Sequence, residues 1–132
     1  MKATIPFASL LLACTAVAQA ADIDSLLDAY RSAGAADFSA TRGAAIWSAI
    51  YRIDGQERAC SSCHTDDPAA SGKHLRTGKP IEPMAASVNP SRFTDAAKVA
   101  KWFRRNCKWT LGRECTPQEK GDLLTWLNAT RE

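Results

Sequence analysis

The chain has 132 residues, of which 45% are hydrophobic, and its 17 Lys and Arg against 14 Asp and Glu give a formal net charge of +3. A chain of this length is enough for one domain and too short for two. So small a positive excess does not indicate nucleic acid or an anionic membrane surface as a partner.

Residues 1–20 have the pattern of a secretory signal peptide. Lys2 provides the positive start, the apolar run IPFASLLLAC follows, and AQA places small residues before a cut after Ala20. The run is too short to span a bilayer. Acylation at Cys14 is the alternative, which the bulky Leu12 disfavours. The sequence therefore predicts export to a bacterial periplasm, with residues 21–132 as a single mature domain.

Apolar periodicity and capping residues predict four helices in the mature chain. They cover residues 24–33, 38–52, 94–109 and 116–129. Their expected N-caps are Asp24, Ser39, Thr94 and Thr116. The last helix has the clearest start, because Pro117 occupies its first position and Glu119 completes a capping box.

The rest of the mature chain shows no strand pattern, and the proline-rich segment 65–93 is expected to be a loop. Gly43 would permit close approach of another backbone, and the last helix offers an apolar stripe. That stripe consists of Leu123, Leu124, Trp126 and Leu127. An all-α domain packed around a cofactor is the predicted fold class.

Cys60 and Cys63 are two residues apart, and His64 follows directly. In an exported chain this CxxCH motif is typical of covalent haem c attachment, with two thioethers and a histidine ligand to the iron. A structural zinc site would need four ligands, and the sequence has no second CxxC or HxxxH. Removal of Cys14 and use of two cysteines by haem would leave Cys107 and Cys115, which an oxidising compartment would pair as a disulfide.

The ligand on the other face of the iron is not fixed by the motif. Met84 is the usual choice for an electron carrier and ranks first from the residues alone. Asn106 ranks second, because helical winding of residues 94–110 places it in the middle of the apolar side, where an amide needs a partner. His74 and Asn89 fit solvated loop and turn positions instead.

The opposite side of that helix is basic. It carries Lys98, Lys101, Arg105 and Lys108. Such a stripe is usually a solvated face, and the alternative is a docking patch for an acidic redox partner.

A helix with Gly43, the CxxCH motif, a loop and a last helix with Trp126 resembles the class I cytochrome c plan, with four to five helices around one covalently bound haem. The resemblance implies that the first and last helices of that plan cross where the glycine meets the aromatic residue. From about Gly43 to the C-terminus, about two thirds of the chain, the sequence also resembles the sphaeroides haem protein family. The distinctive elements are RFTD, then RNC, then GREC, within GKPIEPMAASVNPSRFTDAAKVAKWFRRNCKW and GRECTPQEKGDLLTWL.

This resemblance implies a periplasmic monohaem cytochrome in which an asparagine ligates ferric iron. The matching asparagine in this sequence is Asn106, directly before Cys107. The resemblance therefore ranks Asn106 ahead of Met84 as the sixth ligand. It also implies binding of O2, NO or CO in the reduced state. The expected redox partner is another mono- or dihaem cytochrome c or a membrane cytochrome, with no role for nucleic acid. The alternatives are a Met84-ligated electron carrier and a small O2 or NO reductase. An electron-transfer and gas-binding role is favoured over an enzyme.

Overall fold

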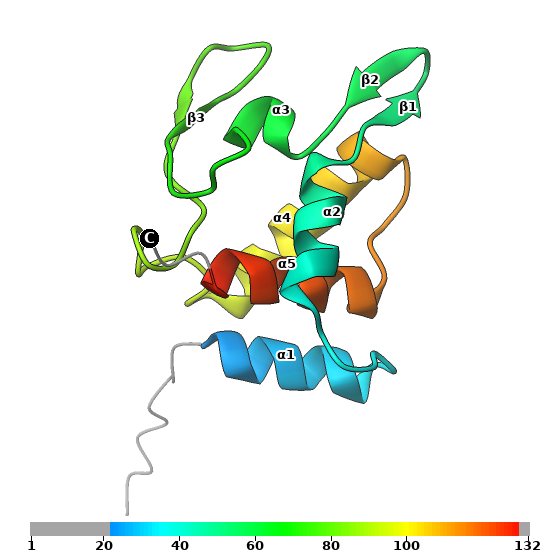
Figure 1. Cartoon of the computed structure of the whole chain (residues 1–132), viewed down its shortest axis with the longest axis vertical. Coiled ribbons are helices and arrows are strands. Elements are labelled where there is room, and N and C mark those ends of the chain that lie inside the picture. Colours follow the sequence, from blue (N-terminus) through cyan, green and yellow to red (C-terminus); the bar gives the residue numbers. More distant parts are fainter. Residues whose placement is uncertain (1–21, 130–132) are drawn as a thin grey trace, which may run out of the picture.

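The computed structural model describes residues 22–129, so the predicted signal peptide lies outside the described residues. Five helices follow one another along this part of the chain (Figure 1). They are α1 (Ile23–Ser32), α2 (Ala40–Ser48), α3 (Ser61–His64), α4 (Ala96–Leu111) and α5 (Pro117–Ala129). The all-α, class I-like prediction is confirmed. None of the helices in residues 22–129 has both the length and the apolar character that a membrane span requires.

Short polar side chains start the helices, and two of the predicted caps are wrong by one or two residues. Asp22 accepts from the Ser25 amide at 2.7 Å, and Asp95 accepts from the Lys98 amide at 3.0 Å, in place of Asp24 and Thr94. The Thr94 hydroxyl instead donates to the Ser91 carbonyl at 2.9 Å. Within each pair of candidates, the residue whose carboxylate reaches the amide three positions later is the cap.

The predicted caps of α2 and α5 are confirmed. Ser39 accepts from the Arg42 amide at 3.2 Å. Thr116 accepts from the Glu119 amide at 3.2 Å, and Glu119 accepts from the Thr116 amide at 2.8 Å, which is the complete capping box.

The core forms where α2 crosses α5, with α1 packed against α5 on the side away from α3 (Figure 1). Gly43 makes this crossing possible, because a Cβ atom there would collide with the Asp122 carbonyl and with Trp126 Cβ. Trp47 and Trp126 then pack at 5.1 Å between ring centroids. Leu123, Leu124 and Leu127 are buried as predicted.

We expect Gly43→Ala to lower the free energy of unfolding by about 2 kcal/mol, because the added methyl group must push two packed helices apart. Chemical denaturation of the purified haem protein measures this. Ala45→Ser on the exposed side of the same helix is the control and should change the free energy by less than about 0.5 kcal/mol. Equal effects of the two substitutions would show that the crossing does not depend on glycine.

The prediction that the chain contains no strand is wrong. Two antiparallel hairpins are present: β1 (Tyr51–Ile53) with β2 (Gln56–Arg58), and β3 (Gly72–Lys73) with β4 (Pro80–Ile81). Asp54 and Gly55 join the first pair with φ of 52° and 75°, the left-handed conformation that a two-residue type I′ turn requires. Tyr51 and Ile53, included in or next to the predicted second helix, are therefore extended.

Candidate functional site

The helix α3 brings Cys60, Cys63 and His64 together on little more than one turn, with Cys60 immediately before it. Both thiols are free and half-buried. Burial raises the pKa of Cys60 to about 11, which a hydrogen bond with the Thr110 side chain partly offsets. Cys60 is therefore a neutral thiol at neutral pH and not a thiolate. Across residues 22–129 no three His, Cys, Asp or Glu side chains are grouped so that they could hold a metal ion.

His64 is held as a neutral imidazole. Burial lowers its pKa to about 4, and the positive charge of Arg92 adds to the effect. Its Nδ1 atom is buried and has no hydrogen-bond partner within the described chain. A neutral imidazole with a nitrogen lone pair to offer is the form that binds a metal. The residues present therefore fit a haem group attached at the two thiols and ligated by His64.

Two neighbouring elements hold α3 in place. From α2, Trp47 packs against the His64 ring at 5.4 Å between centroids, and its Nε1 donates to the Thr65 carbonyl at 2.8 Å. From β3, Gly72 lies so close that a Cβ atom there would collide with the Cys63 carbonyl. The contact between Trp47 and His64 had no signal in the sequence, because it joins two separate elements.

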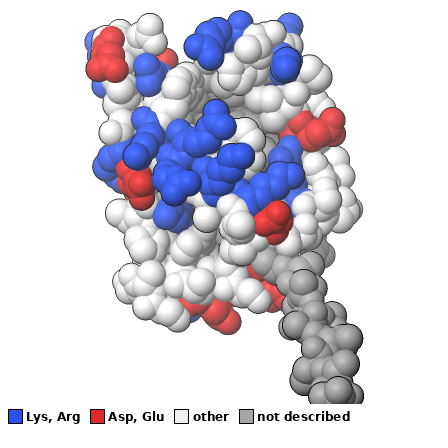
Figure 2. Space-filling model, turned by 180° about the vertical axis from the view of Figure 1, so that it is seen from behind, with Lys and Arg blue, Asp and Glu red and all other residues white. Residues whose placement is uncertain are grey.

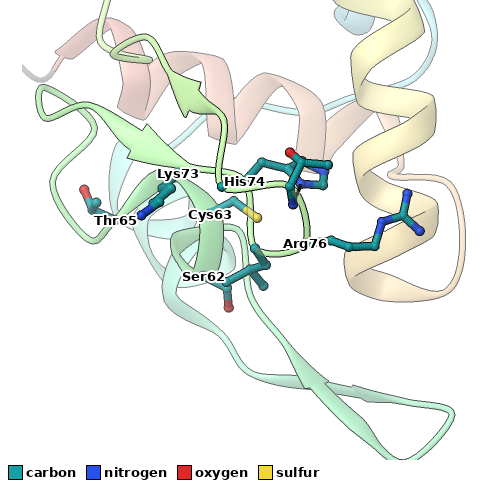
Figure 3. A pocket seen from close by; sticks show the side chains of 9 residues that line it. Ser62, Cys63, Thr65, Lys73, His74 and Arg76 are labelled. Carbon is teal, nitrogen blue, oxygen red and sulfur yellow. Dashed lines mark hydrogen bonds between the residues drawn. The ribbon is translucent and has the colours of Figure 1, made fainter.

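A cavity of about 580 Å³ opens beside Cys63. It is lined by Ser62, Cys63, Thr65 and residues 73–78. Figure 3 shows the Cys63 sulfur among these side chains, with Lys73 and Arg76 contributing two positive charges to the lining. Cys63 therefore lines a cavity that also has basic residues in its wall.

Asn106 was expected in the middle of the apolar side of this helix, as a buried amide. The prediction that its side chain is buried is wrong, because Asn106 is exposed. The buried residues of α4 are Val99, Cys107, Thr110 and Leu111. On the same helix, Trp102 is 44% exposed and Trp109 is 40% exposed. Trp102, Asn106 and Trp109 share a helix face beside the buried stripe, since they are spaced four and three residues apart.

Asn106 is nevertheless on the same helix as Thr110, which interacts with Cys60. It is one helical turn before Thr110, the residue whose side chain meets the Cys60 thiol. Its side-chain amide makes no hydrogen bond with any residue in 22–129. The side chain is thus available to bind a group placed next to α3.

The other three candidates for the sixth ligand have contacts of their own. Met84 is half-buried and packs against the main hydrophobic cluster. His74 is exposed, and its Nδ1 accepts from the Thr77 amide at 3.1 Å. Asn89 donates to the Pro83 carbonyl at 3.4 Å and accepts from the Ser91 hydroxyl at 2.8 Å.

The disulfide predicted between Cys107 and Cys115 is present, with 5.5 Å between the Cα atoms. It follows Asn106 directly and is buried with Leu111 in a second hydrophobic cluster. The bridge ties the end of α4 to the segment that starts α5. Closing so small a loop stabilises the fold by about 2–3 kcal/mol in the loop-entropy account.

Two features together define a class of protein. They are the crossing of α2 and α5 at Gly43, and the two free thiols and neutral histidine on an adjoining turn. This class is the c-type cytochromes of class I-like fold. Comparison with known proteins narrows this class. Residues 33–127 match the family described as a domain of unknown function, DUF1924. Cytochrome c-type protein SHP of Cereibacter sphaeroides is 42% identical over 92% of this chain and 94% of its own.

Solved structures agree with this relationship. Oxidised SHP, described as an oxygen-binding cytochrome c, superposes with a TM-score of 0.78 at 41% identity over 84% of this chain and 99% of that chain. Oxidised cytochrome c″ of Methylophilus methylotrophus has a TM-score of 0.74 at 36% identity over 83% and 95% of the two chains. The chain belongs to the DUF1924 family and is homologous to cytochrome c-type protein SHP.

Proposed function

We propose that this chain is a periplasmic monohaem cytochrome that exchanges single electrons and binds O2, NO or CO when reduced. Cys60 and Cys63 carry the haem c, His64 is its permanent ligand and Asn106 its displaceable one. Residues 1–20 direct export and residues 21–132 form the haem domain. When bound, haem supplies the one-electron couple and the coordination position that Asn106 and a diatomic gas compete for.

The observation that carries this proposal is the position of Asn106 on α4. Its unpaired amide lies one turn from the contact between Thr110 and Cys60, on a helix whose end is fixed by the Cys107–Cys115 disulfide. Met84, the rival ligand, is half-buried and packs against the main hydrophobic cluster. The oxygen-binding description of the SHP structure, and the haem-ligand detachment named for a solution structure of cytochrome c″, support the same conclusion.

The ligand chemistry of Asn106 gives the switch its direction. An amide oxygen is a hard, neutral donor, which prefers ferric to the softer ferrous iron. Reduction should therefore loosen the Asn106 side chain, and its NH2 group remains available as a donor to a bound gas. His64 does not move in this scheme, because Trp47 and the buried setting of α3 hold its ring.

Covalent attachment is the first property to test. We expect one haem per chain that remains with the polypeptide after acid–acetone extraction, because two thioethers join it to Cys60 and Cys63. Mass spectrometry of the extracted polypeptide measures this. Cys60→Ala with Cys63→Ala should leave a chain that loses any haem on extraction, and extraction of haem from the native chain would contradict the assignment.

A further inference from the structure

The exposed side of α4 carries basic residues and no acidic one. We define the α4 basic surface as Lys98, Lys101, Arg104, Arg105 and Lys108, all of which are exposed. Figure 2 shows Lys and Arg side chains gathered over the middle of one face of the molecule, with Asp and Glu only at the edges of the group. The whole chain has a formal net charge of only +3. The basic residues on this face are therefore a local concentration of positive charge and do not reflect a large positive charge of the whole chain.

Most of these charges are not neutralised within the described chain. Lys108 approaches Glu114 at 3.9 Å, and the other four make no ion pair with any residue in 22–129. Other arginines of the chain do have carboxylate partners: Arg31–Asp28, Arg42–Asp122, Arg52–Glu57 and Arg113–Glu119. Like charges three and four residues apart destabilise a helix, so the arrangement is unfavourable for folding alone.

An indole lies within the same surface. Trp102 is 44% exposed, with the Arg105 guanidinium 5.1 Å and the Lys101 ammonium 6.0 Å from its ring centroid. Trp and Arg are the residues most enriched among those that dominate binding energy at protein interfaces. A purely solvated face needs only charge, and an exposed Trp held between two cations adds contact area for a protein partner.

The surface is also next to the redox site. The same helix carries Asn106 and meets the Cys60 thiol through Thr110. A protein docked on α4 would therefore be brought close to the attached group. A chain with a single redox centre must receive its electrons from another molecule, and surface charge of opposite sign speeds such encounters.

We propose that the α4 basic surface is the docking site for an acidic redox protein that delivers electrons to this cytochrome. The proposal rests on the electron-transfer function above and adds the place and the charge of the partner. In the transfer step one electron leaves the reduced partner and converts the ferric protein to the ferrous form.

Flavodoxin, an acidic protein, is a suitable probe. Its hydroquinone anion gives up one electron to become the neutral semiquinone, with no proton transferred. We compare stopped-flow reduction of the haem-loaded wild type with Lys101→Glu/Arg105→Glu. The control, Arg31→Glu/Arg52→Glu, changes the net charge equally at two exposed sites on α1 and β1. Photogenerated lumiflavin semiquinone, small and uncharged, reports the reactivity of the haem itself.

At low ionic strength the α4 variant should react with flavodoxin at least tenfold more slowly than the wild type, and the control variant within about threefold of it. The difference should shrink as salt is added, and all three proteins should react alike with lumiflavin semiquinone. Equal slowing of the control, or slowing of the α4 variant with lumiflavin as well, would overturn the proposal. Unchanged flavodoxin rates would also overturn the proposal. Binding of the three proteins to vesicles containing anionic phospholipid is measured in parallel, and a variant that lost only this binding would indicate a membrane surface instead. Failure of the proposed function would appear separately, as wild-type protein without a reducible haem spectrum.

Discussion

Asn106→Ala is expected to abolish the native ferric ligation and leave the iron open or bound by water. Alanine has no donor atom, and the disulfide fixes the end of α4, directly after position 106. The change should appear in the ferric absorption and electron paramagnetic resonance spectra as conversion to a high-spin or water-ligated species. Carbon monoxide should bind the reduced variant at least as fast as the wild type, because the competing ligand is gone.

Met84→Ala is the matched comparison, since it shortens the rival ligand to the same residue. Its ferric spectrum should stay nearly unchanged, with a loss of stability because Met84 packs against the hydrophobic cluster. The reverse pattern, with native ligation lost in Met84→Ala and kept in Asn106→Ala, would identify an ordinary electron-transfer cytochrome.

Asp122→Ala should lower the free energy of unfolding by about 3 kcal/mol or more. The Asp122 side chain is 2% exposed and lies at the crossing of α2 and α5. It accepts from the Ser39 amide at 2.7 Å, from Arg42 Nε at 2.8 Å and from the Gln118 amide at 3.1 Å. Removal of the carboxylate leaves these donors without their partner. Urea denaturation gives the value.

Asp28→Ala is the control, because Asp28 also pairs with an arginine but is 74% exposed, and it should cost less than about 0.5 kcal/mol. The acid dependence has a defined sign. Burial acts to raise the pKa of Asp122, but hydrogen bonds from Arg42, Ser39 and Gln118 outweigh it and the pKa lies below its usual 3.8. The stabilisation is therefore fully present above pH 3.8 and is lost as pH falls through the lower folded value. Similar losses for the two variants at pH 7 would contradict this account.

Local signals predicted part of the local structure, and two of the four expected caps were wrong by one or two residues. The capping box of Thr116 and Glu119 and the Ser39 cap involve residues three apart, so the sequence contains both partners. The Asp-Gly turn at residues 54–55 is also a local signal, but the hairpin around it was not predicted. Apolar residues before the turn continue the helical pattern of α2, so the short strand was assigned to that helix. The crossing at Gly43 was anticipated through the resemblance to class I cytochromes and not from periodicity.

Contacts between distant segments could not be predicted. Trp47 against His64, Thr110 against Cys60 and Arg42 against Asp122 each join separate elements, and periodicity does not say which elements meet. The apolar side of α4 also appeared wider than the stripe that the protein buries. Trp102 and Asn106 lie at its edge, and a helical projection cannot tell whether an edge residue faces protein or an open face.

The exchange of Asn106 for a gas on reduction is the central claim, and absorption spectra of the wild-type protein in both redox states, with and without carbon monoxide, test it most directly. The account predicts a six-coordinate ferric form without a methionine–iron charge-transfer band. It also predicts a five-coordinate or weakly ligated ferrous form that binds carbon monoxide quickly. A ferric form that shows the methionine band, together with a ferrous form that stays six-coordinate and does not react with carbon monoxide, would contradict it.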